Sequence, residues 1–418
     1  MIAVPSRRKF LGQIGGLGAA GLLTAVASAQ LPQRPRTRPK LPIENVVLCC
    51  NENRSFDHYF GYAPFAGSYG VPAGYSQPSG TPGANVKPYD VNSTISPNPN
   101  HDWATIHGDW DNGKLDGFVT SGGGVTMAYT DGSQLGYYHT LFSEYTLCAN
   151  YFCSMLGPTF PNRLYLAGAT SGGQTTNNIA AGSLDWPVIL DLLDSRGITW
   201  KVYNIGGTCS VSGGLSSLYC DNHFQFFKRW VSEPRVNSFA DADYYSDLTN
   251  GKLPQVSFLM TNDINGEHPP YPLDLGETLQ QQLITALQQS RYWARAAYFL
   301  TYDEGGGFFD HVVPPVFDAY GAGFRVPTWV ISPFAKKGHI EGTPFEHSSL
   351  LKFVERVFDL PTLASINHQF DVRTPGGSAN DAANGAPYGP PAPPRDARID
   401  IGDMTQCFRW PDTHAPRG

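Results

Sequence analysis

The sequence predicts an α/β protein with a central, mostly parallel sheet sandwiched between helices. Short apolar runs bounded by polar or turn residues indicate strands that are covered on both faces, and they fall at residues 46–50, 198–203, 255–260, 297–302 and 326–331. Helical patterns alternate with these runs, at residues 186–196, 277–295 and 348–358. In open sheets of this kind, ligands bind beyond the carboxyl ends of the strands.

The composition is that of a globular protein with many loops. Glycine and proline contribute 45 and 34 of the 418 residues, while 41% hydrophobic content supports a core. Loss of residues 1–29 would remove three of 29 basic residues and no acid, leaving 26 basic against 36 acidic side chains and a net charge of −10. A protein so acidic is not built to coat nucleic acid or an anionic membrane.

The first residues have the features of an export signal. Arg7 and Arg8 precede an uncharged run at 12–25, and small residues at 27–29 fit a cleavage site. This pattern predicts a twin-arginine signal peptide over residues 1–29 and export to the periplasm or the medium. A membrane anchor is the alternative, but the run is short and rich in glycine and alanine. No later run of the sequence is long and apolar enough to span a membrane.

The remaining chain divides by composition. Residues 30–42 form a Pro-rich, basic linker, and residues 43–370 form one main domain. Within that domain, residues 62–145 lack the alternation of strands and helices and are expected to form a loop-rich insertion that caps the site. The Pro/Gly-rich tail of residues 371–418 is expected to lie at the periphery. The oligomeric state is not predicted.

Polar residues follow two of the predicted strands at their carboxyl ends. Glu52 and Asn53 follow the run at 46–50, and Asp303 and Glu304 follow the run at 297–302. If the two strands are neighbours, three carboxylates and one amide oxygen meet, and such like charges repel unless a cation lies between them. This indicates one divalent metal ion, with Ca²⁺, Zn²⁺, Mn²⁺ and Mg²⁺ all open. Helix caps and surface acids are the alternative.

Thr159 is a candidate nucleophile. It lies in Gly157-Pro158-Thr159-Phe160-Pro161-Asn162-Arg163, just before a helical run, where backbone N–H groups favour an anion. Metal coordination would lower the pKa of its hydroxyl. Taken alone, this segment favours an ordinary N-cap.

Histidines in polar, Pro/Gly-flanked loops complete the inventory. They are suited to phosphate binding or to protonation of a leaving oxygen: His101, His268, His311 and His347. A single histidine is more often structural, and His347 directly precedes a predicted helix. Seven cysteines suggest disulfides, with Cys209–Cys220 the first candidate pair and Cys148–Cys153 the second. Cys49 and Cys50 are expected to be buried thiols.

Five motifs occur in the order seen in a bacterial phosphoesterase family: ENRSFDHYFG, GPTFPNR, GEHPPYP, TYDEGGGFFDHVVPP and EHSSLLKF. The chain resembles that family over about residues 43–360. The family contains non-haemolytic-type phospholipases C and related acid phosphatases, within the alkaline-phosphatase-like superfamily. The resemblance implies an alkaline-phosphatase-like α/β fold.

The resemblance also implies roles for individual residues. Glu52, Asn53, Asp303 and Glu304 resemble the family's metal ligands, and Thr159 resembles the Ser/Thr nucleophile that also touches the metal. Groups that hold phosphate oxygens or assist the leaving group correspond to Asn162, His101 and His268. Other residues are expected near or behind the site: Arg54, Asp57, His58, His223, Asp310, His311 and His347.

The expected activity is metal-dependent hydrolysis of a phosphoric ester through a phosphothreonine. Phosphatidylcholine-type diesters are the first expected substrate, and phosphate monoesters, cleaved by an acid phosphatase, are the alternative. A non-catalytic binding protein is a third hypothesis, although every motif residue is present. Aromatic residues of the insertion would cage a choline ammonium or pack the loops: Tyr69, Tyr75, Trp103, Trp110, Tyr129, Tyr137 and Tyr138. The additional C-terminal domains of longer phospholipases C are expected to be absent, which weakens any inference of haemolytic action.

Overall fold

The computed structural model describes residues 40–209, 218–239, 241–366 and 393–411. The predicted signal peptide, most of the linker and most of the tail lie outside these ranges. The described residues form an eight-stranded sheet in the order β10-β7-β11-β1-β12-β13-β6-β14. Its strands are β1 (Asn45–Asn51), β6 (Thr146–Cys148), β7 (Trp200–Asn204), β10 (Ser238–Phe239), β11 (Val256–Met260), β12 (Ala296–Tyr302), β13 (Trp329–Ile331) and β14 (His339–Glu341).

The sheet is mostly parallel, as predicted. From β10 to β12 every neighbouring pair is parallel, and β6 pairs in parallel with β14. The exception is β13, which runs antiparallel to both of its neighbours. It is also shorter than the predicted run at 326–331, because residues 326–328 lie outside any strand.

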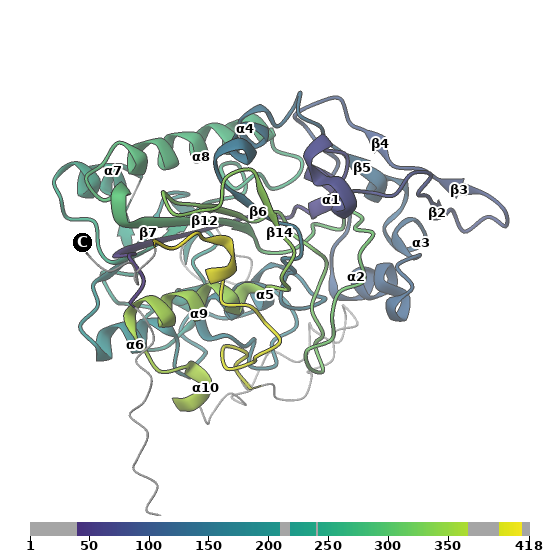
Figure 1. Ribbon diagram of the computed structural model, residues 1–418. Coiled ribbons are helices and arrows are strands. Elements are labelled where there is room, and N and C mark those ends of the chain that lie inside the picture. The colour runs from purple at the N-terminus through teal and green to yellow at the C-terminus, as the bar shows by residue number, and fades with distance from the viewer. Residues whose placement is uncertain (1–39, 210–217, 240, 367–392, 412–418) are drawn as a thin grey trace, which may run out of the picture. The chain divides into compact units, whose positions relative to one another are not determined.

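Helices cover both faces of the sheet (Figure 1). One face carries α5 (Thr159–Gly168), α6 (Ile189–Ser195) and α9 (His347–Phe358), and the other carries α4 (Gly136–Glu144), α7 (Asp241–Thr249) and α8 (Leu273–Gln288). The three predicted helices are therefore present. Their boundaries differ, since α6 begins at Ile189 and α8 begins directly after Pro272.

Smaller elements connect these layers. The helices are α1 (Phe56–Phe60), α2 (Trp103–Trp110), α3 (Phe118–Gly122) and α10 (Leu363–Ile366). Three further two-stranded sheets pair β2 (Gln77–Pro78) with β3 (Asn85–Val86), β4 (Tyr89–Asp90) with β5 (Ala128–Tyr129), and β8 (Thr208–Cys209) with β9 (Leu218–Tyr219). Among the described residues, no helix has the length and apolar character needed to cross a membrane.

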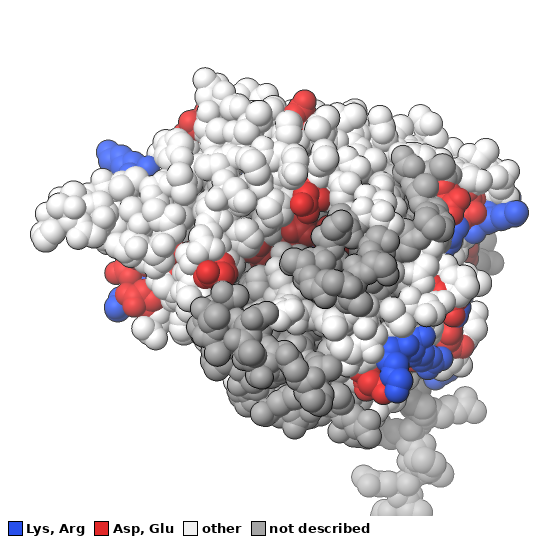
Figure 2. Space-filling view, turned by 180° about the vertical axis from the view of Figure 1, so that it is seen from behind, with Lys and Arg blue, Asp and Glu red and all other residues white. Residues whose placement is uncertain are grey.

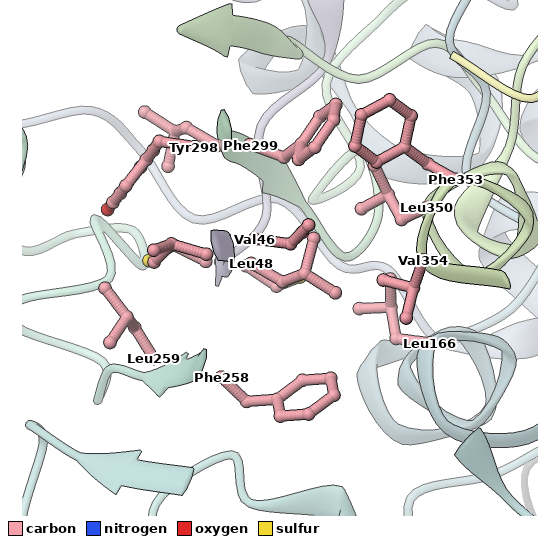
Figure 3. Packing of buried hydrophobic residues seen from close by; sticks show 14 of the residues in the cluster. Val46, Leu48, Leu166, Phe258, Leu259, Tyr298, Phe299, Leu350, Phe353 and Val354 are labelled. Carbon is pink, nitrogen blue, oxygen red and sulfur yellow. The ribbon is translucent and has the colours of Figure 1, made fainter. Parts of the chain in front are cut away.

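The core explains why the central strands are apolar on both sides. In β1, Val46 and Leu48 point toward the layer of α5 and α9, where Leu166, Leu350 and Val354 meet them (Figure 3). All five side chains are buried. On the neighbouring strands, side chains alternate between this layer and the opposite one. Burial on both faces removes apolar surface from water and fixes the register of the parallel strands.

The tail is not wholly peripheral, which corrects one expectation. Residues 393–411 pack onto the domain, where Met404, Cys407 and Phe408 join the main core. Arg395 is fully buried and donates to Asp318 Oδ2 at 2.7 Å. A few apolar side chains and one partly buried ion pair therefore hold a segment whose composition is that of a loop.

The cysteines differ in part from the prediction. Cys220 is disulfide-bonded, but the side chain of its predicted partner, Cys209, lies outside the described residues. The second candidate pair is wrong, because Cys148 and Cys153 are both free, buried thiols. Cys49 and Cys50 are also free and buried, as expected for residues of a central strand.

Candidate active site

Strands β1 and β12 lie side by side, so their carboxyl ends deliver polar residues to one place. The register pairs Asn51 with Tyr302, and the next residues along each strand are therefore neighbours. The backbone N–H of Asn53 donates to Asp303 Oδ1 at 2.9 Å, and the backbone N–H of Asp303 donates to the Asn51 carbonyl at 3.0 Å. The predicted proximity of the two strand ends is confirmed.

The glycines after Glu304 allow the two strand ends to approach closely. The backbone N–H of Gly306 donates to Glu304 Oε2 at 2.7 Å. Its φ of +64° lies in the left-handed region, and a Cβ at this position would clash with the Asn53 carbonyl oxygen. Asn53 itself has a φ of 58°, a conformation that asparagine tolerates better than most residues.

A buried guanidinium, which the sequence analysis left without a role, lies between the carboxylates. Arg163 Nη2 donates to Glu52 Oε1 at 2.7 Å, and Arg163 Nε lies 3.4 Å from Asp303 Oδ2. A further carboxylate, Asp221, lies 3.7 Å from Arg163 Nη2. Asp221 was also missed, because it comes from a loop far away in the sequence. Together these contacts form a buried charge network at the floor of the site.

Burial and like charges raise the pKa values of two carboxyl groups here. For Glu52, burial is the first cause, followed by the negative charges of Asp221 and Asp303, and its pKa lies well above the ordinary value although Arg163 lowers it. For Glu304, burial and then the charge of Asp303 raise the pKa well above the ordinary value. A single guanidinium therefore does not fully compensate the acids, and further positive charge would be stabilised.

Thr159 is the first residue of α5, with Pro158 and not Thr159 in the N-cap position. Its exposed fraction is 7%. Arg163 follows four residues later, and residues four apart lie on the same face of a helix. Because Arg163 contacts Glu52 and Asp303, Thr159 lies one turn away on the face that meets the strand ends. The alternative of an ordinary N-cap is not what the structure shows.

Asn162 holds the loop that precedes Thr159. Its Oδ1 accepts from the Met155 backbone N–H at 2.9 Å, and its Nδ2 donates to the Gly157 carbonyl at 2.8 Å and the Pro158 carbonyl at 3.1 Å. The residue is fully buried. Its amide thus positions the loop that precedes Thr159, and its predicted contact with phosphate stays a prediction.

Two histidines meet at the amide of Asn53. The Nδ2 atom of Asn53 lies 3.1 Å from His101 Nε2 and 2.8 Å from His268 Nε2. In each ring Nδ1 is paired with a backbone carbonyl, that of Pro99 for His101 and that of Pro269 for His268. A neutral imidazole that donates through Nδ1 presents Nε2 as an acceptor. Burial lowers the pKa of His101, which favours this neutral form.

With the nitrogen toward the histidines, Oδ1 faces two acids, Glu304 and Glu52, the latter at 3.3 Å from Oε2, whereas the reversed amide would donate to both acids and accept from both histidines. Oxygen atoms so close, with no hydrogen between them, repel unless a cation joins them. The reversed amide would instead require Nε2–H on both histidines, which their Nδ1 pairing opposes unless the rings are charged. The donor set therefore fits a hard or borderline divalent ion held by oxygens.

The fit of this donor set to a divalent ion depends on Asn53. Within the described residues, no three His, Cys, Asp or Glu side chains converge closely enough to hold an ion by themselves. The Asn53 amide is the group that lies between Glu52 and Glu304. Arg163 contacts the other oxygen of Glu52, Oε1, and Oδ2 of Asp303.

His347 and His311 occupy different surroundings. His347, the first residue of α9, is fully buried, with Nε2 2.8 Å from the Asp303 carbonyl and Nδ1 3.2 Å from the Tyr151 hydroxyl. Burial lowers its pKa to about 4, so it is a neutral brace behind Asp303. His311 lies in a second charged cluster, with Nδ1 2.6 Å from Asp57 Oδ2.

The second cluster contains buried acids and a base. Arg325 bridges Asp57 at 2.8 Å and Asp310 at 2.9 Å. These contacts hold α1, which follows the β1 strand end, against the loop after Glu304. The predicted substrate contacts of His311 and His347 stay predictions, and in the structure both rings have protein partners.

Residues behind the site form a third network, which sequence reasoning missed. Glu267 is fully buried, and its carboxylate accepts hydrogen bonds from Tyr59, Tyr138, Tyr302 and Asn51. Its carbonyl accepts from Arg54 Nε at 2.9 Å. The neighbouring His268 is thereby held in place. Tyr138 is engaged here, which removes it from the residues expected to cage choline.

Other expected residues lie apart. His58 is fully buried, with Nε2 3.0 Å from Arg54 Nη1 and Nδ1 2.8 Å from the Ala128 carbonyl, so it supports Arg54 as expected. His223 is buried beside Arg163, which together with burial lowers its pKa to about 3. Trp103 stacks on His107 at a ring distance of 4.0 Å, and Tyr129 stacks on Tyr62, also at 4.0 Å. Such contacts are loop packing.

The surface charge is uneven. On the face shown in Figure 2, Asp and Glu side chains lie in a hollow near the middle, while Lys and Arg side chains lie toward the edges. The whole chain carries a formal net charge of −7. An anionic ligand would meet an unfavourable field on approach to these acids.

Comparisons with known proteins agree with the predicted resemblance. The model of the Phosphoesterase family matches residues 43–361. "Non-hemolytic phospholipase C" of Burkholderia pseudomallei is 28% identical and covers 99% of this chain and 66% of that protein. "Hemolytic phospholipase C" of Pseudomonas aeruginosa is 30% identical, with 82% and 56% covered. "Phospholipase C A" of Mycobacterium tuberculosis is 29% identical, with 85% and 81% covered.

The chain spans two thirds or less of the first two relatives. Among solved structures, a protein in the alkaline phosphatase superfamily from Vibrio parahaemolyticus has a TM-score of 0.39 at 12% identity, over 76% of this chain and 68% of that one. Likeness at this level says nothing about function. The family match covers nearly the whole of the main domain, and the chain therefore belongs to the Phosphoesterase family.

Proposed function

We propose that this protein is a metal-dependent phosphoric-ester hydrolase that acts as a phospholipase C on phosphatidylcholine-type diesters. The observation that carries the proposal is the position of Asn53, whose amide joins two histidines to the carboxylates of Glu52 and Glu304. The names of the relatives support the substrate class.

In the proposed first step, Thr159 Oγ1 attacks phosphorus in line with the departing alcohol. The start of α5 supplies the positive end of the helix dipole, which stabilises the anionic phosphoryl group. The O–P bond to diacylglycerol breaks, and phosphocholine remains on Thr159. Arg163, one turn along the helix, keeps Glu52 and Asp303 in place during this step.

His101 and His268 are the candidates that accept the proton of the Thr159 hydroxyl and pass it to the leaving oxygen of diacylglycerol. Both rings lie at the Asn53 amide, and the His101 side chain is 19% exposed, so it can exchange protons with solvent. In the second step, water attacks phosphorus, one histidine accepts its proton, and phosphocholine is released as Thr159 regains its hydroxyl proton.

A divalent ion, when bound, would lower the pKa of the Thr159 hydroxyl and neutralise charge on the phosphoryl oxygens. Glu52, Asn53, Asp303 and Glu304 are the residues that would hold it, with Thr159 as a further oxygen donor.

The second candidate function is an acid phosphatase that hydrolyses phosphate monoesters. The same nucleophile and acids would serve, and the two activities differ in whether the pocket accepts a second substituent on phosphorus. The purified protein, supplied with each divalent ion in turn, should be offered phosphatidylcholine beside an aryl phosphate monoester. Phosphocholine release that Thr159→Ala abolishes and Thr159→Ser partly retains supports the phospholipase. Inorganic phosphate from the monoester alone supports the phosphatase, and an active Thr159→Ala variant rejects the nucleophile.

Export through the twin-arginine route is also part of the proposal, and it rests on Arg7 and Arg8, the uncharged run at 12–25 and the small residues at 27–29. Replacement of both by lysine should leave the full-length precursor inside the cell. Equal amounts of the wild type and of the lysine variant in the periplasmic fraction would reject this route.

A further inference from the structure

Two cysteines far apart in the sequence meet in the core. Cys148 lies in β6, and Cys407 lies in a short 3-10 helix, η7 (Thr405–Cys407), within the C-terminal segment 393–411. Their Sγ atoms are 3.6 Å apart, across 259 positions of sequence. Both thiols are free, and both side chains are fully buried.

Backbone contacts fix this approach. The Thr146 hydroxyl donates to the Cys407 carbonyl at 3.0 Å, and the Lys336 backbone N–H donates to the same carbonyl, also at 3.0 Å. Ala335 and Phe408 form an isolated β-bridge beside it. The proximity therefore comes from the path of the chain and not from one side-chain rotamer. A disulfide needs an S–S distance of about 2.05 Å, so the two sulfurs would have to move closer together to form the bond.

We propose that Cys148 and Cys407 form a disulfide under oxidising conditions and that this bond fastens the C-terminal segment to the sheet. The oxidant is a disulfide compound. The thiolate of one cysteine attacks it, forms a mixed disulfide and displaces one thiolate, and the other cysteine then attacks the mixed disulfide and displaces a second. The protons of the two cysteines end on the two released thiols. Because both cysteines are buried, exchange takes place during folding or when the segment lifts.

The bond would also support the candidate site. In the same segment, Arg395 donates to the Ser154 carbonyl and lies 3.9 Å from Glu346 Oε2. Glu346 caps α9, and the next residue, His347, contacts the Asp303 carbonyl. Fastening residues 393–411 thus stabilises the brace behind Asp303. This inference does not depend on the proposed activity.

Peptide mapping of the wild-type protein tests the bond directly. The native protein is equilibrated with oxidised glutathione. It is then unfolded in a denaturant that contains iodoacetamide but no reductant, and digested with chymotrypsin. Cleavage after Tyr151 or Phe152 separates Cys148 from Cys153. The proposal expects one linked species that contains Cys148 and Cys407, two hydrogens lighter than the sum of its free peptides, with Cys153 alkylated. Separate alkylation of Cys148 and Cys407, or linkage of either to another partner, would overturn it.

Thermal unfolding with and without reductant gives a second test. Reductant also cleaves the Cys220 disulfide. The fall in melting temperature on adding reductant is therefore compared between the wild type and Cys407→Ser. The wild type should lose about 5 °C more than the variant, the size expected for one disulfide. Cys153→Ser, which removes a buried thiol with no sulfur partner, is the control and should behave as the wild type. Equal losses in the wild type and in Cys407→Ser would contradict the proposal.

Discussion

The side-chain nitrogen of Asn53 lies 3.1 Å from Nε2 of His101, with the His101 Nδ1 atom held by the Pro99 carbonyl. This contact sets the direction of the whole amide. With the nitrogen turned to the histidines, Oδ1 must face Glu52 and Glu304. Much of the proposed chemistry follows from this one orientation, because it gives a site for a cation with two imidazoles next to it.

Metal binding is expected to need Asn53. Asn53→Ala removes the oxygen between two carboxylates and should weaken divalent-ion affinity by at least about 100-fold. Metal content after dialysis and the thermal shift on adding each ion measure this without reference to activity. Asn85→Ala, at an exposed position, is the matched control and should bind as the wild type does. An Asn53→Ala protein that keeps its ion would contradict the assignment.

Leaving-group protonation is expected to distinguish the two histidines from the metal ligands. His101→Gln and His268→Gln remove the acid, so loss of activity should be greatest for esters of alkyl alcohols, about 10²- to 10⁴-fold. An aryl ester with a good leaving group needs little protonation and should lose much less. The ratio of kcat values for alkyl and aryl esters is the measurement. A variant that slows both esters equally has lost something other than the acid.

Gly306 is expected to be irreplaceable. Gly306→Ala would introduce a Cβ against the Asn53 carbonyl at a positive φ, at a cost of about 2 kcal/mol or more in the free energy of unfolding. Denaturant unfolding measures the cost. Gly124→Ala is the control, because a Cβ there would meet no atom within 4 Å. If Gly306→Ala and Gly124→Ala had similar free energies of unfolding, the ends of β1 and β12 would not need to approach so closely.

Asp109 is expected to make stability fall with rising pH. It is fully buried, and neither carboxylate oxygen has a hydrogen-bond partner among the described residues. Burial raises its pKa from 3.8 to about 9, with Asp102 as a lesser cause. Between these values the folded state keeps a proton that the unfolded state has lost. The free energy of unfolding should therefore decrease as pH rises through this window, by at most about 1.4 kcal/mol per pH unit.

The Asp109→Asn variant is neutral at every pH and should lack this slope. Equilibrium unfolding of both proteins from pH 5 to pH 8 gives the difference, and Asp90→Asn, at an exposed position, controls for loss of surface charge. If wild type and Asp109→Asn show the same pH dependence, Asp109 is ionised in the folded protein.

Features that depend on a local sequence pattern could be predicted from the sequence. Runs of apolar residues gave the long central strands, and the polar residues after β1 and β12 gave the two ligand pairs, because strand ends are local features. Strands β6 and β14 have only three residues each, too few for a periodic signal. Residues 393–411 were expected at the periphery because their apolar side chains are scattered among polar ones.

The buried charged residues of the site had no comparable local pattern in the sequence. Arg163, Asp221 and Glu267 come from three distant segments, and their partners are defined only when the fold brings the segments together. Arg163 alone left a trace, since it follows Thr159 by one helical turn. Asn162 shows the opposite case, in which a residue chosen for phosphate binding has its amide satisfied by its own loop.

The most direct test of the account is to trap the covalent intermediate. The metal-loaded protein is mixed with phosphatidylcholine, quenched in acid within milliseconds to seconds, digested and examined by mass spectrometry. The account predicts phosphocholine on the peptide that contains Thr159, absent from Thr159→Ala and from protein quenched before mixing. Turnover of the lipid with no adduct at any quench time, or with the adduct on another residue, would contradict the central claim.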